Sequence, residues 1–189
     1  MKTASNRTHA IVVASDLFLK RGLVNTSIDD VVKESGVSKS NIYYHFKSKE
    51  ELIVAVLNYR ISMFQETVHT ILLTDLSFKE RMRLIFTSLA EELDGRSCVG
   101  GCPILAMLAF PMPELRSRIN RFFVDLREMV EGMLIQGVAT KEFRADIPIS
   151  QTADLVITSI EGSLMLAEAH GDSSVVAKSG EALLHLLQV

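Results

Sequence analysis

The chain has 189 residues, of which 48% are hydrophobic and 23% are charged, and its net charge is −3. Four Pro and ten Gly leave no low-complexity or disordered signature, and the apolar content is ample for a packed core. The longest apolar runs are far shorter than the ~18 residues of a membrane-spanning helix, and the first residues lack a signal-peptide pattern. These features exclude a membrane-spanning chain and predict a cytoplasmic protein.

The small net charge conceals an asymmetry along the chain. Residues 1–60 hold nine Lys and Arg against six Asp and Glu, whereas residues 61–189 hold eleven against seventeen. A basic front and an acidic remainder are typical of a DNA-reading domain joined to a domain with another task.

The first helix is predicted over Asn6–Arg21, after a frayed tail at residues 1–6. Its apolar residues recur at helical spacing, and Gly22 ends it. These apolar residues are Ala10, Ile11, Ala14, Leu17 and Phe18.

Two short helices follow within the stretch TSIDDVVKESGVSKSNIYYHFKSKEEL, residues 26–52. Thr26 or Ser27 can cap the first of them, because an Asp stands three residues beyond each. Gly36 ends this helix, since only Gly adopts the left-handed conformation at low cost. Ser38 can cap the second helix, KSNIYYHF, and the pattern as a whole predicts a helix-turn-helix.

The second helix has one apolar side and one polar side. Ile42 and Phe46 are four residues apart and share the buried side. The other side chains can all donate hydrogen bonds to the acceptors that a DNA major groove offers. A helical hairpin that turns this face to water is the alternative, but it would expose two adjacent tyrosines. The donor residues are Lys39, Ser40, Asn41, Tyr43, Tyr44 and His45.

Further helices are predicted to the end of the chain, and the first of them starts at Lys49. A lysine in the first turn opposes the helix dipole unless a phosphate approaches, so we favour a phosphate contact over a chance surface lysine. Ser77 and Glu80 predict a capping box for the next helix. The predicted ranges are 49–72, 77–93, 103–110, 113–139, 148–170 and 174–187.

The last two predicted helices, about 148–170 and 174–187, carry apolar groups on opposite sides. One side can face the core of the protomer, and the other needs a partner. A second copy of the chain would complete an isologous four-helix interface, with Gly162 and Ser163 allowing close approach. The alternative is a helix that is simply central within a monomer.

The helix-turn-helix stretch resembles the DNA-binding domain of the TetR/AcrR family of transcriptional repressors over roughly residues 7–60. The segments GGCPILAMLAF and IEGSLMLAEAHGD resemble the ligand domain of its LmrA-like branch. The resemblance implies an all-α fold of about nine helices, with a three-helix DNA-binding domain at 1–50 and a ligand-binding and dimerisation domain at 51–189. It also implies a homodimer on a palindromic double-stranded operator, released by a small-molecule inducer.

The resemblance assigns DNA contacts residue by residue at the matching positions. Base contacts are expected from Lys39, Ser40 and Tyr44, beside the cap residue Ser38. Phosphate contacts are expected from Thr26, Ser27, Asn41, Tyr43, His45 and Lys49.

A pocket for a small apolar or aromatic ligand is our hypothesis for the second domain, because Met and Phe recur there and Met adapts to varied partners. Taken one at a time, such residues could simply fill the core. The candidates are Met63, Phe64, Phe86, Cys102, Met107, Phe110, Phe122, Phe123, Met129 and Ser159.

Three alternatives remain open at this stage. Cys102 precedes the predicted helix at Pro103, whose dipole could lower the pKa of the thiol and make the chain a redox or electrophile sensor; a buried structural thiol is the other interpretation. The chain could be a helical enzyme, although no catalytic constellation stands out, or an architectural DNA-binding protein without a ligand. The spacing of Cys98 and Cys102 fits neither a redox motif nor a zinc site, and we expect no metal or cofactor.

Overall fold

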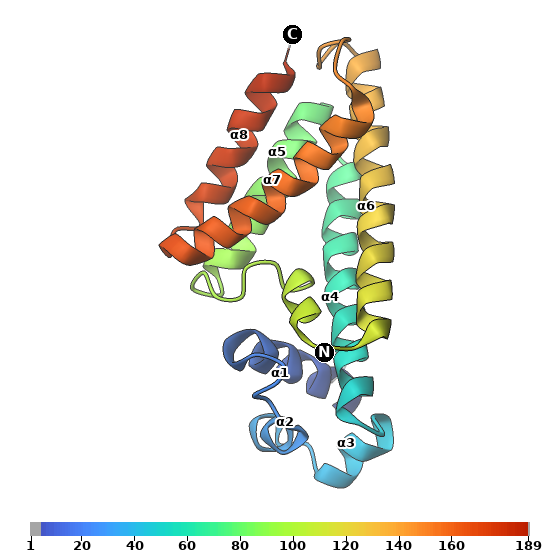
Figure 1. The fold of residues 1–189 in the computed structure, drawn as a ribbon, viewed down its shortest axis with the longest axis vertical. Coiled ribbons are helices and arrows are strands. Elements are labelled where there is room, and N and C mark those ends of the chain that lie inside the picture. The colour runs from blue at the N-terminus through green and yellow to red at the C-terminus, as the bar shows by residue number, and fades with distance from the viewer. Residues whose placement is uncertain (1–4, 189) are drawn as a thin grey trace. The chain divides into compact units, whose positions relative to one another are not determined.

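The computed structural model describes residues 5–188 (Figure 1). Over this range the regular elements are eight α-helices and one 3-10 helix, which confirms the predicted all-α fold. They are α1 (Asn6–Arg21), α2 (Ile28–Ser35), α3 (Lys39–His45), α4 (Lys49–Leu72), α5 (Phe78–Asp94), η1 (Leu105–Ala109), α6 (Pro113–Ala139), α7 (Ile149–His170) and α8 (Ser174–Leu187).

The N-terminal tail was predicted over residues 1–6, of which residues 1–4 lie outside the described range. Ser5 is not part of a frayed tail, because it caps α1, and α1 begins at Asn6, as the helix prediction had it.

Local capping interactions set several helix ends. Ser27 accepts a hydrogen bond from the backbone N–H of Asp30, whose carboxylate accepts one from the backbone N–H of Ser27. Ser77 and Glu80 form the same reciprocal box at the start of α5. Both predicted capping boxes are therefore confirmed. Gly36, with φ 67°, ends α2 in the left-handed conformation, which a residue with a Cβ adopts only at a cost.

The predicted helix at 103–110 is shorter and of a different type. Only Leu105–Ala109 is regular, and it is a 3-10 helix. The backbone N–H of Met107 donates to the carbonyl oxygen of Ile104, and that of Phe110 donates to the carbonyl oxygen of Met107. Each N···O distance is 3.2 Å, and each bond joins residues three apart, as in a 3-10 helix. Pro103 precedes this turn and Pro111 follows it, so the segment has little room for the bonds of an α-helix.

By its contacts the chain forms two compact units. The first contains the residues up to Phe64 together with Pro103–Ile119. Here α1, α2 and α3 gather around the beginning of α4 (Figure 1). The core of this unit includes the fully buried side chains of Ile42, Ile53 and Leu57. The first unit therefore includes two stretches of the second predicted domain, 51–189.

The second unit contains Gln65–Cys102 and the residues from Asn120 onward. In it α8 packs against α5 and α7 (Figure 1). Gly180 lets α8 approach the ring of Phe86 closely, because a Cβ at this position would lie 2.5 Å from Cγ of Phe86. An ion pair between Arg83 and Glu181 joins α5 to α8 at the surface.

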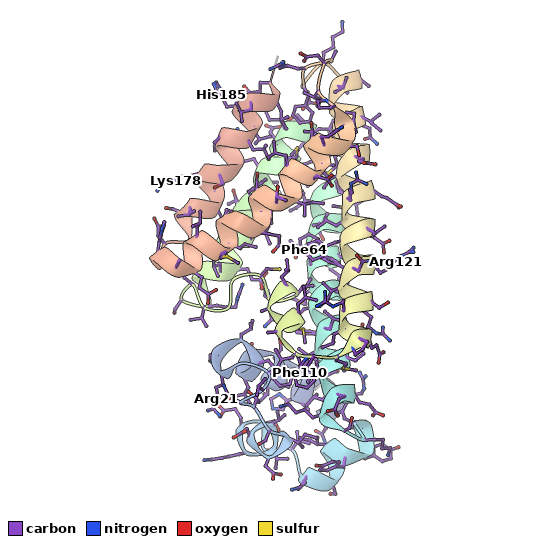
Figure 2. The ribbon with its side chains drawn as sticks, viewed as in Figure 1. Arg21, Phe64, Phe110, Arg121, Lys178 and His185 are labelled. Atoms are coloured by element: carbon purple, nitrogen blue, oxygen red, sulfur yellow. The ribbon has the colours of Figure 1, made fainter. Side chains whose placement is uncertain are left out.

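The outer side of α8 carries polar side chains such as Lys178 and His185 (Figure 2). Within residues 5–188, no helix combines the length and the apolar character that crossing a bilayer requires.

Candidate nucleic-acid interface

The helix-turn-helix is built around buried side chains on one side of α2 and α3. Ile28 and Val31 of α2 are buried, as are Ile42 of α3 and Phe46 directly after it. The hydroxyl of Ser38 accepts a hydrogen bond from the backbone N–H three residues later and so caps α3. This packing fixes which side of α3 faces outward.

The outward side of α3 presents the predicted donors together. Lys39, Ser40, Tyr43 and Tyr44 are exposed, and Tyr44 is 74% exposed. The ring of His45 is half-buried and makes an edge contact with that of Tyr44, with centroids 5.0 Å apart. A polar, donor-rich helix face that also carries two tyrosine rings suits a DNA groove better than bulk water.

An acidic partner of Lys39 was missed by the sequence reasoning. The Nζ atom of Lys39 lies 2.7 Å from Oδ1 of Asp29, which stands in the first turn of α2. The hydrogen bond to Asp29 and the charge of its carboxylate raise the pKa of Lys39. Lys39 is therefore cationic and held toward α2. The helical spacing within α3 gives no signal for this contact, because it joins two helices.

Lys49 stands at the start of α4, as predicted, and two groups from elsewhere in the chain hold its ammonium. Its Nζ atom donates to the carbonyl oxygen of Val24 over 3.4 Å. The same atom lies 5.7 Å from the centroid of the Phe110 ring. Neither neighbour was expected from the sequence.

The hydroxyl groups before and at the turn have structural partners. Thr26 is only 1% exposed, and its hydroxyl donates to the carbonyl oxygen of Gly22 over 2.9 Å. The predicted phosphate contact through the Thr26 side chain is therefore wrong. The hydroxyl of Ser27 is exposed but donates to the Asp30 carboxylate over 2.6 Å, and that of Ser38 lies 3.2 Å from the Ser40 hydroxyl.

Asn41 lies at the edge of the exposed side of α3. Its side chain is half-buried, and its Oδ1 atom is buried without a hydrogen-bond partner. An amide left unsatisfied in this way can gain a partner when a donor or an ordered water approaches.

The structural reason for expecting a reactive Cys102 does not hold. The expected helix dipole is missing, because a 3-10 helix of five residues begins only at Leu105. Cys102 instead hydrogen bonds with Glu161 of α7, whose pKa is raised by burial. The contact with Cys102 lowers the Glu161 pKa, as expected when the thiol donates to the carboxylate, and a carboxylate in that place disfavours a thiolate.

The predicted pocket residues fall in both compact units. Met63, Phe64, Met107 and Phe110 belong to the first unit. The other candidates belong to the second unit, where Phe86 and Phe122 are buried and the rest are half-buried. These are Phe86, Cys102, Phe122, Phe123, Met129 and Ser159.

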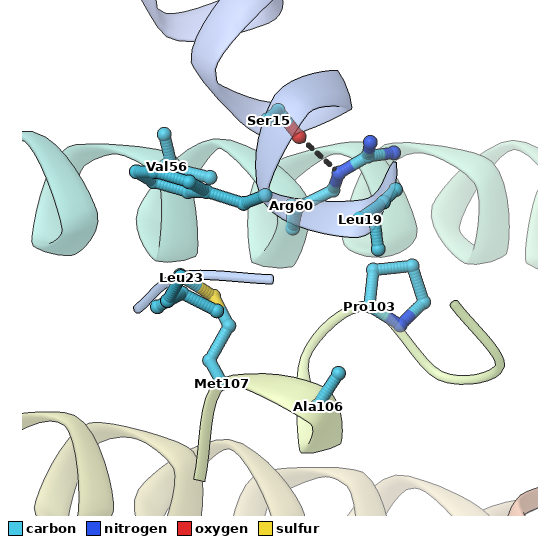
Figure 3. A pocket seen from close by; sticks show the side chains of 9 residues that line it. Ser15, Leu19, Leu23, Val56, Arg60, Pro103, Ala106 and Met107 are labelled. Atoms are coloured by element: carbon cyan, nitrogen blue, oxygen red, sulfur yellow. Dashed lines mark hydrogen bonds between the residues drawn. The ribbon is translucent and has the colours of Figure 1, made fainter. Parts of the chain in front are cut away.

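A small cavity in the first unit contains one of the candidates, Met107 (Figure 3). Its volume is about 20 Å³, which is water-sized and far below the ~300 Å³ of a small-molecule site. Arg60 borders it and donates from Nε to the hydroxyl of Ser15 over 2.5 Å (Figure 3). This cavity is a packing feature between α1, α4 and η1.

A capped two-helix turn with an exposed face of hydrogen-bond donors defines a helix-turn-helix DNA-binding protein. Residues 10–56 match the family described as "Bacterial regulatory proteins, tetR family". Residues 79–183 match "Tetracyclin repressor-like, C-terminal domain". The second match spans more than half of the chain, and the chain belongs to the TetR family of bacterial transcriptional regulators.

Curated relatives and a solved structure agree with this assignment. The HTH-type transcriptional repressor DhaR of Mycobacterium sp. (strain GP1) is 28% identical over 162 residues, covering 84% of this chain and 80% of DhaR. The regulator LmrA of Bacillus subtilis (strain 168) is 23% identical over 190 residues, covering 98% of this chain and 95% of LmrA. A TetR regulator from Chloroflexus aurantiacus J-10-FL has a TM-score of 0.81 and 28% identity, covering 95% of this chain and 92% of that one.

The resemblance to TetR/AcrR repressors, LmrA included, is thus confirmed. The relatives are transcriptional regulators, which favours this class over the enzyme alternative.

Proposed function

We propose that the chain is a dimeric repressor that reads a palindromic operator with α3 and leaves it when a small apolar or aromatic ligand binds. The observation that carries the proposal is the exposed donor face of α3. Because Ile42 and Phe46 are buried, the opposite face of α3 points to solvent, and its donors are already exposed in the absence of DNA.

The proposed contacts follow from exposure and donor chemistry. Lys39, Ser40 and Tyr44 would read base edges. A second group of residues would contact phosphates. Such contacts fix the position of the protein along the duplex but do not distinguish one base sequence from another. Ser38 remains in the interface as the N-cap of α3. The proposed phosphate contacts are Ser27, Asn41, Tyr43, His45 and Lys49.

Dimerisation through α7 and α8 is supported by an exposed apolar stripe. Leu155, Met165 and Leu166 of α7 are 48%, 71% and 52% exposed, and Leu186 of α8 is 65% exposed. Gly162 lies on the same exposed side of α7, and a Cβ built there would meet nothing within 4 Å. Packing within the protomer therefore does not require a glycine at this position, whereas close approach of a partner helix would.

Ser163 plays a different part from the one predicted. It is buried, and its hydroxyl donates to the carbonyl oxygen of Ile160 over 2.8 Å. Ser163 thus belongs to the core, and Gly162 alone of the predicted small pair faces outward.

In a two-fold dimer two α3 helices would lie one DNA turn apart, ~34–36 Å, on a palindrome.

The ligand part of the proposal rests on the second unit. Half-buried Phe123 and Met129 of α6 and Ser159 of α7 combine apolar surface with one hydroxyl. A ligand that prefers the form with low DNA affinity would shift the population away from the operator, and DNA would weaken ligand binding reciprocally. Compounds that raise the melting temperature and also release the operator would support this; stabilisers that leave the operator bound would contradict it.

The DNA part is tested by selecting duplexes from a random pool and measuring affinity against salt. Lys49→Ala is expected to weaken binding to all sequences alike and to lower the salt slope by about one. Lys39→Ala is the matched contrast, with a selective loss of discrimination at one base pair. A sequence-selective loss for Lys49→Ala, or a pool without any enriched palindrome, would contradict the proposal.

A further inference from the structure

A segment from the second half of the chain is built into the DNA-binding unit. Pro103–Ile119 follows the loop that ends α5, yet its contacts assign it to the first unit. Met107 is 2% exposed and lines the small cavity beside Leu23 and Val56 (Figure 3). Packing of this kind fixes the position of the residues that follow η1.

Phe110 is the residue that ends η1, and its backbone N–H donates to the carbonyl oxygen of Met107. Its ring is half-buried and belongs to the first unit (Figure 2). The ammonium of Lys49 lies over this ring, 5.7 Å from its centroid, and also donates to Val24. Three separate segments, after α1, at the start of α4 and after η1, therefore meet at one ammonium group.

We infer that Phe110 is a positioning residue for the phosphate contact of Lys49. The inference rests on the proposed function, in which Lys49 holds a phosphate of the operator. Phe110 itself touches no DNA in this arrangement. It acts by holding the lysine ammonium where the phosphate will lie.

The geometry leaves Lys49 able to bind while it is held. An ammonium has three N–H donors, and the carbonyl of Val24 takes one of them. Even with a second N–H directed at the face of the ring, a third remains for a phosphate oxygen. Lysine has a long flexible stem, and holding it in one place beforehand reduces the conformational entropy lost on binding.

An acidic neighbour gives the ring a second use. The pKa of Glu50 is lowered chiefly by a hydrogen bond from its own backbone N–H and one from Ser48, and to a smaller extent by the charge of the adjacent Lys49. Without the Phe110 ring, Lys49 has one attraction fewer to hold it away from Glu50. A lysine drawn to a carboxylate is less available to a phosphate, and loss of the ring should weaken DNA binding.

The test uses the full-length protein and a duplex selected in vitro, with affinity measured across a range of salt. Phe110→Leu keeps an apolar side chain and removes the ring. It is expected to lower the affinity about two- to five-fold and to reduce the salt slope by part of the unit that Lys49→Ala removes. Phe110→Tyr retains the ring and is expected to restore both quantities.

A double-mutant cycle separates positioning from general packing. In a Lys49→Ala background, Phe110→Leu is expected to have no further effect, because the group it positions is gone. Phe78→Leu is the matched control: it removes a similar contact, with Arg81 5.0 Å from the Phe78 ring, in the second unit. It should leave the affinity and the salt slope unchanged.

The inference is overturned if Phe110→Leu binds as tightly as the wild type or more tightly, or if it loses the same factor with and without Lys49. A wild-type protein that binds no duplex at any salt would overturn the proposed function, and this inference with it. Normal wild-type binding without coupling between the two residues overturns the inference alone.

Discussion

Replacing Gly162 by Leu should affect the protomer and the dimer in opposite directions. Gly162 lies within α7, and its missing Cβ would meet nothing within 4 Å. In an isolated protomer the Cβ of a substituted residue would therefore clash with nothing, and the exposed position leaves the rest of a Leu side chain free to extend into solvent. Leu is a better helix former than Gly by about 0.8 kcal/mol, so the helix itself should gain stability.

In the proposed dimer, by contrast, the same substitution should be destabilising. A side chain inserted into a close helix contact costs about 1–3 kcal/mol, and a two-fold axis brings the substitution into the interface twice. Even the lower figure gives about 2 kcal/mol per dimer. This corresponds to a rise of about 30-fold in the dimer dissociation constant.

Sedimentation equilibrium over a range of protein concentrations measures that constant directly. Gly132→Leu is the matched control, because Gly132 lies within α6 of the same unit and also has nothing within 4 Å of its ideal Cβ. It should gain the same helix stability with no change in association. An unchanged dimer constant for Gly162→Leu, or equal changes for the two variants, would refute the assignment of the interface to this face of α7.

Three further predictions concern stability, each measured by urea denaturation. Gly180→Ala should lower the free energy of unfolding by about 1–3 kcal/mol, because its Cβ would lie 2.5 Å from Cγ of the buried Phe86 ring; an unchanged midpoint would contradict the close packing. Ser27→Ala should lower it by about 1 kcal/mol through loss of the cap of α2. Hydrogen bonds from Ser27 lower the pKa of Asp30, so this stabilisation should be present at neutral pH and shrink as the pH falls through that lowered pKa; a difference that stays constant in acid would count against it. Burial raises the pKa of Glu161 above its ordinary value of 4.5, so the wild type should lose stability as the pH rises through the raised pKa. Glu161→Gln should remove that loss, and identical pH profiles for the two proteins would exclude it.

Helix ends were predictable from sequence where short-range interactions decide them. The box of Ser27 with Asp30 joins residues three apart, and the left-handed Gly36 depends only on its own lack of a Cβ. Such signals survive in any tertiary context. The predicted bounds of α1, α4, α6 and α8 also agree with the structure.

The features that sequence reasoning missed depend on residues distant in the chain. Thr26 reads as an exposed cap, but it is buried, and its hydroxyl lies 3.4 Å from the carbonyl oxygen of Leu17, nine residues earlier in α1. Lys39 meets Asp29 across two helices, and Lys49 meets Phe110 across 61 positions of numbering. Met107 was predicted to lie in the second domain, but it packs in the first unit. Its apolar character alone cannot tell which of the two units a methionine belongs to.

The discontinuous make-up of the first unit matters for anyone who wishes to retarget this repressor. A chimera that exchanges only the residues up to Phe64 would place a foreign head against the native Pro103–Ile119 segment. Met107 would then pack against foreign side chains in place of Leu23 and Val56, beside which it lies in this chain. A graft that carries both stretches keeps these packing partners together.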